Sequence, residues 1–88
     1  MNIMNDILLL INQWDPVDLF PMAPFDEYMP EVIEICKLLK IPQITKEELS
    51  YNINMIFLKK FGGDVYVEDI YKCDEIAQKI LQLPPRVS

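Results

Sequence analysis

Apolar residues recur at helical spacing along most of the chain. Residues 2–14, 30–41, 45–61 and 68–83 carry apolar side chains three and four positions apart, the period of an amphipathic helix. Val65–Val67 could form a strand, but no second strand is present to pair with it. The pattern therefore predicts an all-α fold, in which residues 1–88 form a single domain and a compact antiparallel bundle of four main helices.

Local signals predict where these helices begin and end. The sequence Thr45–Glu48 is a capping box that should start the third helix, and Gly62–Gly63 should stop it. Pro30 suits the first position of the second helix, after a separate turn over residues 26–28, and Pro42 should end that helix. We expect Pro84–Pro85 to end the last helix.

A Pro-rich connector should join the first and second helices. Asp15 can act as a cap with Pro16 in the first helical position, and Asp18 can favour the same helix start electrostatically. We therefore expect one short helical or 3₁₀ turn over residues 15–20. Two further prolines should keep residues 20–25 extended.

Aromatic residues gather around this connector. We expect Trp14 to anchor the core, with its indole N–H bonded to the connector backbone; the alternative is an exposed interface residue. At least two of the side chains Phe20, Phe25 and Tyr28 should pack inward. If they were exposed together, they would form an apolar patch ringed by acids, which is typical of a protein-binding surface.

Charge is distributed unevenly along a chain whose net charge is −6. Residues 1–36 carry seven acidic side chains and no Lys or Arg, whereas residues 37–88 carry eight basic and seven acidic side chains. An acidic half repels phosphate backbones, so we expect no nucleic-acid partner. It suits a basic protein or a cation, although the simpler interpretation is that the acids keep a small protein soluble.

The residue types needed for most catalytic sites are missing. The chain has no His, and its two Gly are adjacent, so it has neither the commonest general base nor a phosphate-binding loop. Cys36 and Cys73 form no metal-binding or redox motif and are expected to be reduced. The sequence predicts a non-enzymatic protein without a cofactor or metal.

Targeting signals are also missing from the sequence. No basic residue precedes the apolar stretch 7–11, and that stretch is far shorter than the roughly 20 residues that cross a bilayer. We therefore expect a cytoplasmic protein that does not bind membranes.

The stretch INQWDPVDLFPMAPFDEYMPEVIEI, residues 11–35, resembles the YugE-like family of small uncharacterised proteins from Bacillus and relatives. Trp14-Asp15-Pro16 and Asp26-Glu27-Tyr28 carry the resemblance most distinctively. Two positions depart from the family pattern, which usually has glycine where Asp18 stands and a polar helix starter where Met29 stands. The resemblance implies an all-helical cytoplasmic domain with no established activity and no catalytic residues to carry over.

Three hypotheses about function follow. The first is an interaction module, for example an immunity or antitoxin-like inhibitor, that binds a basic protein. The second is a carboxylate site for a divalent cation or for hydrolysis, built from Asp15, Asp18, Asp26 and Glu27, although capping explains most of these acids. The third is self-association as a homodimer. The candidate interaction surface comprises Trp14, Asp15, Asp18, Phe20, Phe25, Asp26, Glu27, Tyr28, Glu31 and Glu34.

Overall fold

The computed structural model describes residues 3–83, and within that range the chain forms helices, turns and loops without a strand. The helices are α1 (Ile3–Trp14), α2 (Met29–Leu38), α3 (Lys46–Phe61) and α4 (Ile70–Leu81). The all-α prediction is therefore confirmed. The predicted start at Asn2 and the predicted stop at Pro84–Pro85 lie outside the described residues.

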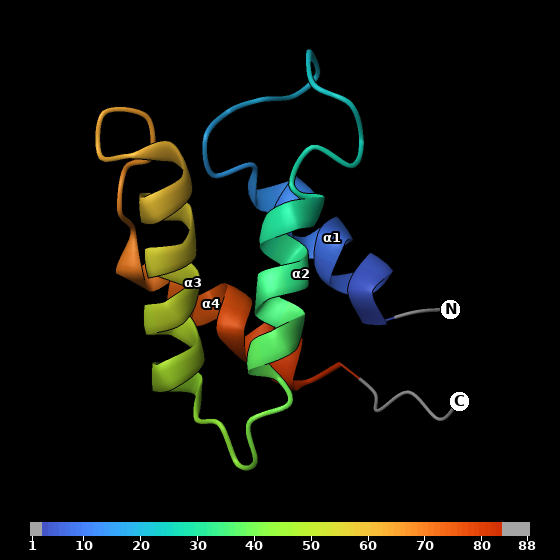
Figure 1. Ribbon diagram of the computed structural model, residues 1–88, viewed down its shortest axis with the longest axis vertical. Coiled ribbons are helices and arrows are strands. Elements are labelled where there is room, and N and C mark those ends of the chain that lie inside the picture. Colours follow the sequence, from blue (N-terminus) through green and yellow to red (C-terminus); the bar gives the residue numbers. More distant parts are fainter. Residues whose placement is uncertain (1–2, 84–88) are drawn as a thin grey trace.

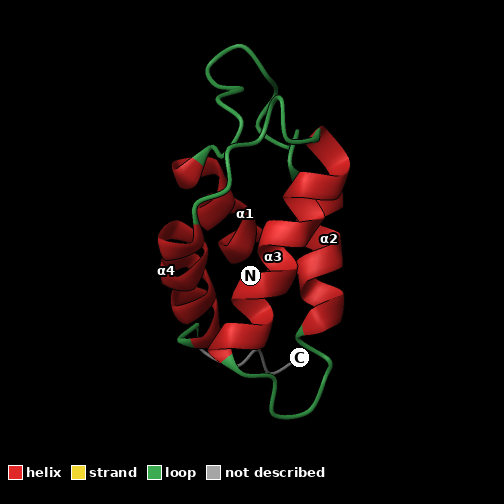
Figure 2. Cartoon of the chain, turned by 90° about the vertical axis from the view of Figure 1, so that its left-hand side faces the viewer, coloured by secondary structure: helices red, strands yellow, loops and turns green. Residues whose placement is uncertain are grey.

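α2 and α3 run side by side in opposite directions along the long axis, whereas α1 and α4 cross them obliquely (Figure 1). α3 packs most extensively against α4, and α2 contacts both α1 and α3. The connector, residues 15–28, and the loop over residues 62–69 lie at one end of the molecule, whereas the loop over residues 39–45 lies at the other end (Figure 1). The connector reaches beyond the helix ends, as Figure 2 also shows.

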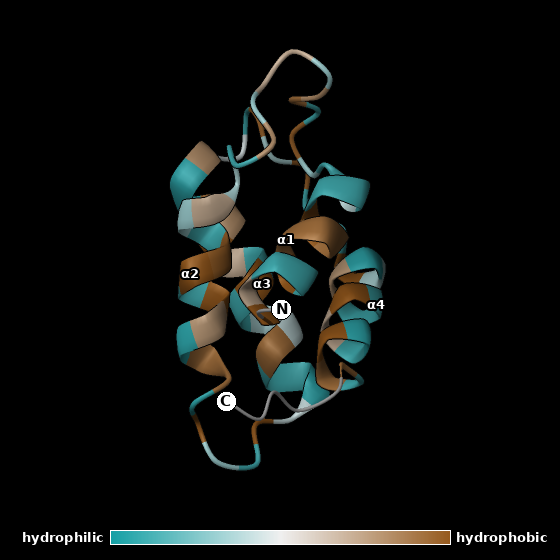
Figure 3. Cartoon of the chain, turned by 90° about the vertical axis from the view of Figure 1, so that its right-hand side faces the viewer, coloured by the Kyte–Doolittle hydropathy of each residue, from teal (hydrophilic) through white to brown (hydrophobic). Residues whose placement is uncertain are grey.

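Each helix contributes one apolar face to a single core. Brown and teal segments alternate along α2 and α4, as expected of amphipathic helices (Figure 3). The predicted apolar stripes supply most of this core, but Ile70 and Leu81, which were predicted in the inward stripe of the last helix, are substantially exposed, as is the flanking Leu9. The fully or nearly fully buried apolar side chains are Ile7, Leu8, Ile11, Tyr28, Val32, Ile35, Leu49, Ile53, Phe57, Tyr66, Cys73, Ile76, Ala77 and Ile80.

The ends of α3 follow the predicted signals, whereas α2 ends at Leu38 and α4 at Leu81, before the predicted residues 41 and 83. Thr45 accepts from the Glu48 N–H at 3.1 Å, and the Glu48 carboxylate accepts from the Thr45 N–H at 3.0 Å, so the capping box is confirmed. Gly62 ends α3 as predicted, but with φ 79° and ψ 160° it adopts an extended conformation open to glycine rather than a left-handed helical cap. The start of α4 was predicted two residues too early, because Asp69 caps it.

The connector does not contain the predicted helical turn. The Asp18 N–H donates to the Asp15 carbonyl at 3.0 Å, so residues 15–18 form a tight turn. Asp15 has φ 51° and Asp18 has φ 55°. An N-cap residue needs an extended backbone, so Asp15 cannot cap a following helix. Asp tolerates the left-handed region better than most residues, which is why the chain can turn here.

Residues 20–25 also differ from the predicted extended conformation. The Ala23 N–H donates to the Leu19 carbonyl at 2.9 Å, so the chain folds back on itself, and the peptide bond between Phe20 and Pro21 is cis. The separate turn before α2 is confirmed, because the Met29 N–H donates to the Asp26 carbonyl at 3.0 Å. α2 begins at Met29, with Pro30 in the first turn, one residue earlier than predicted.

Candidate functional site

Asp15 fixes the connector through its carboxylate. The two carboxylate oxygens accept hydrogen bonds from the Leu19 N–H at 2.8 Å, the Phe20 N–H at 3.1 Å and the Tyr28 hydroxyl at 2.5 Å. Burial raises the pKa of Asp15, but these donors outweigh it and hold the pKa below its ordinary value of 3.8. Asp15 therefore ties both ends of the connector together as a carboxylate.

Tyr28 closes the connector from the other side. Its ring is fully buried, and its hydroxyl also accepts from the Val17 N–H at 3.3 Å. Burial and the hydrogen bond to Asp15 raise the pKa of Tyr28, so the phenol stays protonated and remains a donor. The hydrogen bond between Tyr28 and Asp15 joins residues 13 positions apart and so closes the connector into a loop.

An aromatic cluster lies beneath the connector and joins segments from across the chain. Phe57 of α3 is at its centre, with ring centroids 5.4 Å from Trp14, 5.9 Å from Tyr28 and 5.9 Å from Tyr66. The pairs with Trp14 and Tyr28 are edge-to-face, and such pairs stabilise a core beyond the area that they bury. The full aromatic cluster comprises Trp14, Phe20, Tyr28, Phe57, Phe61 and Tyr66.

Trp14 is an anchor of the core, as predicted, but not by the predicted contact. Its ring packs edge-on against Phe57 and Tyr66 and is partly buried. Within residues 3–83 the indole N–H makes no hydrogen bond to the connector, whose side-chain hydrogen bonds come from Asn12, Asp15 and Tyr28.

The other predicted surface residues divide into exposed and buried groups. Phe20 packs against the core beside Tyr28, whereas Phe25 leaves 62% of its surface exposed. Two of the three connector aromatics therefore pack inward, as predicted. The acidic side chains that remain exposed are Asp18, Asp26, Glu27 and Glu34.

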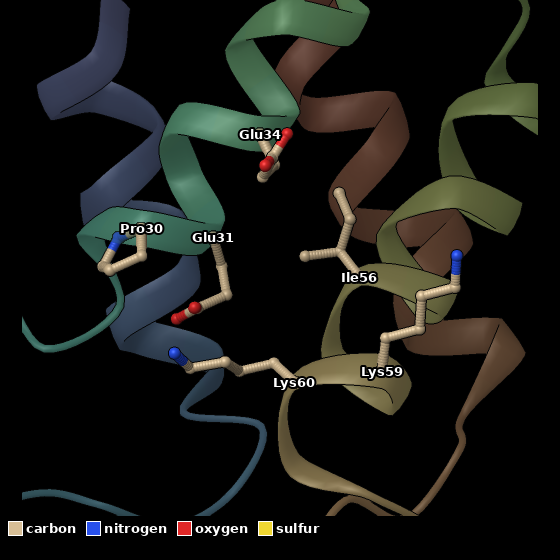
Figure 4. A pocket seen from close by; sticks show the side chains of 6 residues that line it. All are labelled: Pro30, Glu31, Glu34, Ile56, Lys59 and Lys60. Atoms are coloured by element: carbon tan, nitrogen blue, oxygen red, sulfur yellow. The ribbon is translucent and has the colours of Figure 1, made fainter.

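Glu31 was expected on the acidic surface, but it is buried, with 3% of its surface exposed. A cavity of about 480 Å³ lies beside it, lined by residues of α2 and α3. Figure 4 shows the Glu31 carboxylate pointing toward the Lys60 amine across this space. Burial raises the pKa of Glu31, and the nearby Lys60 offsets only part of that rise.

A second acidic loop lies beside the connector, and the sequence prediction did not include it. The ring centroids of Trp14 and Tyr66 are 6.3 Å apart, which places the loop over residues 62–69 against the base of the connector. Val67 and Tyr71 leave 78% and 85% of their surfaces exposed, next to the exposed acids Asp64, Glu68 and Asp69. Counting charge over the whole of residues 37–88 concealed this acidic run, because distant lysines offset it.

We call this combined surface the loop end: the connector over residues 15–28 together with the loop over residues 62–69. Its exposed apolar side chains are Met22, Phe25, Val65 and Val67. Its exposed acidic side chains are Asp18, Asp26, Glu27, Asp64, Glu68 and Asp69.

The connector acids are not arranged as a metal site. Among residues 3–83, no three or more Cys, Asp or Glu side chains group together in a way that could hold a metal ion. Asp15 is occupied by its three donors, so it is not available to share a cation with Asp18, Asp26 or Glu27.

The comparisons with known proteins do not assign the chain to a family. No protein-family model matches it, and no curated protein or solved structure is significantly similar to it. The resemblance to the YugE-like family therefore stays a prediction. None of the helices within residues 3–83 is long and apolar enough to cross a membrane.

Proposed function

We propose that the protein is a non-enzymatic cytoplasmic interaction module that binds a basic protein through the loop end. The observation that supports this most directly is the exposure of Met22 and Phe25, at 92% and 62%, on a connector that is firmly tied to the core. Exposing large apolar side chains to water is unfavourable. Their exposure on an ordered loop is therefore typical of a contact surface.

The connector is ordered at the place where Phe25 projects. The Asn12 side-chain amide of α1 donates to the Phe25 carbonyl at 2.9 Å, and the Asp15–Tyr28 pair closes the same loop. A surface that is already ordered loses less conformational entropy on binding than a flexible loop would. Phe25 and Met22 are thus held in position before a partner binds, as anchor residues in protein interfaces commonly are.

The charge of the loop end favours a basic partner. Asp18, Asp26 and Glu27 are exposed acids of the connector, and the loop over residues 62–69, whose Tyr66 packs against Trp14 at the connector's base, adds the exposed Asp64 and Glu68. Opposite charges accelerate encounter and discriminate against acidic partners, while buried aromatic contacts supply most of the affinity. An inhibitor that covers a basic nuclease or toxin is one concrete form of this function.

Affinity capture with matched variants tests the proposal. We expect the wild-type chain to recover a specific basic protein from native lysate, and the double variant Asp26→Lys/Glu27→Lys to lose it. Phe25→Ala should also weaken recovery, because it removes an anchor rather than a charge. Glu47 is exposed on the first turn of α3, at the opposite end of the molecule. Glu47→Lys is the matched charge control and should recover the partner normally.

Two outcomes would contradict the proposal. Recovery that is equal for the wild-type, loop-end and control chains would show that the loop end does not carry the contact. A concentration-dependent dimer in light scattering that both loop-end variants disrupt would assign the surface to a second copy instead.

A further inference from the structure

The cavity between α2 and α3 has a feature that the packing of the bundle does not explain. Oε1 of Glu31 is buried, and within residues 3–83 no donor reaches it. Buried carboxylate oxygens in native proteins almost always have a hydrogen-bond partner, because leaving one without a partner costs free energy. An acid is favoured near a helix start, and the backbone N–H of Glu31 contacts its carboxylate, but neither requires Oε1 to be buried without a donor.

The walls of the cavity carry opposite charges. Glu31 and Glu34 project from the first turns of α2, and Lys59 and Lys60 project from the last turn of α3 (Figure 4). None of the ion pairs formed among residues 3–83 includes Glu31, Lys59 or Lys60, and Glu34 has only a loose, exposed contact with Lys37 at 3.8 Å. Lys60 therefore acts on Glu31 only at a distance, and neither lysine forms a close ion pair with a glutamate of the opposite wall.

The rest of the lining is apolar. Ile56 and Pro30 supply carbon surface beside the charged groups. A volume of about 480 Å³ lies within the range of roughly 300–1,000 Å³ that is usual for small-molecule sites. The cavity therefore combines room for a small ligand, a short apolar contact and two charged walls.

We propose that this cavity binds a small zwitterion of the amino-acid class. The ligand's ammonium would lie toward α2, beside the Glu31 and Glu34 carboxylates, and its carboxylate would lie toward Lys59 and Lys60 of α3. A simple cation would be repelled by the two lysines, and a simple anion by the two glutamates. Only a ligand that carries both charges is complementary to both walls. This site is independent of the loop end and its partner.

A matched set of ligands tests the charge requirement. L-Leucine and ε-aminocaproate carry both charges on six-carbon skeletons, whereas hexylamine and caproate carry one charge each. Titration of the full chain, followed by calorimetry and by nitrogen–proton correlation spectra, should show binding of at least one zwitterion with a Kd at or below about 1 mM. Shifted resonances should map to residues 30–34 and 56–60. The single-charge ligands should bind at least about tenfold more weakly.

Substitutions then test the site itself. Glu31→Gln should weaken zwitterion binding by at least about tenfold, because it removes a negative charge beside the ligand's ammonium. Lys60→Met removes a positive charge at the surface and leaves the buried Glu31 unchanged. It should weaken zwitterion binding because the ligand's carboxylate loses one of its two positive partners. Glu47→Gln and Lys40→Met change exposed residues outside the cavity and should bind normally.

The proposal is overturned if neither zwitterion shifts any resonance at about 10 mM, a concentration that would reveal even weak millimolar binding. It is also overturned if hexylamine binds as tightly as ε-aminocaproate, or if Lys60→Met and Glu31→Gln both bind as the wild type does. Circular dichroism of each variant establishes that it is folded before it is titrated. If Glu31→Gln does not fold, Lys60→Met still tests the site.

Discussion

At the scale of single residues, Asp15 determines the shape of the connector. One carboxylate satisfies two backbone N–H groups and the buried Tyr28 hydroxyl, so three donors depend on one side chain. Hydrogen bonds to a charged group contribute more than neutral ones, and removal of the charge leaves buried donors without an adequate acceptor.

We predict that Asp15→Asn destabilises the protein by about 2 kcal/mol at neutral pH. Asn tolerates the left-handed backbone of φ 51° nearly as well as Asp, so the substitution tests the carboxylate rather than the turn. The folded-state pKa of Asp15 is lowered, so its contribution is complete above the ordinary value of 3.8 and is lost as the pH falls through the lowered pKa. Urea unfolding at neutral and strongly acidic pH measures this difference. An equal loss at both pH values would contradict it.

Glu31 should have the opposite pH dependence. Its folded-state pKa is raised by burial, so folding favours the protonated acid. That contribution is complete below the ordinary pKa of 4.5 and is lost as the pH rises through the raised value. Glu31→Gln resembles the protonated form and should stabilise the protein by about 1 kcal/mol at neutral pH.

Thermal melts of wild type and Glu31→Gln at neutral pH and below the ordinary carboxyl pKa check this prediction. The difference in Tm should be largest at neutral pH and should disappear in acid. A lower Tm for Glu31→Gln at neutral pH would indicate that the ionised carboxylate is stabilised by Lys60 more than burial destabilises it.

At the scale of elements, α3 shows how far local sequence determines structure. The Thr45 capping box and the Gly62 stop each act over a few neighbouring residues, so both ends of α3 could be predicted from sequence. The apolar stripes predicted the cores of α1, α2 and α4 for the same reason. Their signals are periodic and local.

The connector could not be predicted in the same way. Its conformation depends on the contact between Asp15 and Tyr28, which lie 13 positions apart, and local cap preferences for Asp15 pointed to a helix instead. The cavity beside Glu31 is equally non-local, because residues of α2 and α3 line it together, and neither Lys59 nor Lys60 is marked in the sequence as a neighbour of Glu31. The loop over residues 62–69 was missed because its acids adjoin the connector only in the fold.

We predict that Thr45→Ala lowers the free energy of unfolding by about 1 kcal/mol, the usual cost of losing an N-cap. The Thr45 hydroxyl satisfies the Glu48 N–H at 3.1 Å, and Ala leaves that group to water. Thr45→Ser retains the hydroxyl and should cost much less. Guanidinium unfolding of the three chains measures the effect. If Ser and Ala are equally destabilising, the capping box does not account for the stability of this helix end.

At the scale of the whole molecule, the aromatic cluster connects all parts of the bundle. Trp14 ends α1, Tyr28 precedes α2, Phe57 belongs to α3, and Tyr66 lies between α3 and α4, yet their rings meet. A buried network holds Tyr66 in place, because its hydroxyl donates to the Asn54 side chain at 2.7 Å. The loop end is therefore supported by the same residues that stabilise the core, so the candidate surface and the fold should be lost together.

A small domain cannot lose the centre of this cluster and remain stable. At about 0.05–0.15 kcal/mol per residue, a chain of 88 residues has roughly 4–13 kcal/mol of stability. Phe57→Ala should remove about 3–5 kcal/mol, a large part of the total, whereas Phe57→Leu should remove about 1–2 kcal/mol. Phe25→Ala, at an exposed position in the connector, should change stability by less than about 0.5 kcal/mol and serves as the control.

Two optical probes can establish whether the molecule unfolds as one unit. Far-ultraviolet circular dichroism reports the helices, and the fluorescence of Trp14, the chain's single tryptophan, reports the aromatic cluster. Because Trp14 packs on Phe57 and Tyr66 from different elements, both signals should change at the same denaturant concentration in the wild type and, at a lower concentration, in Phe57→Leu. If fluorescence changed first, the loop end would open while the helices remained folded. In that case the connector would lose its ordered conformation, and with it the fixed positions of Met22 and Phe25, at denaturant concentrations at which the helices are still folded.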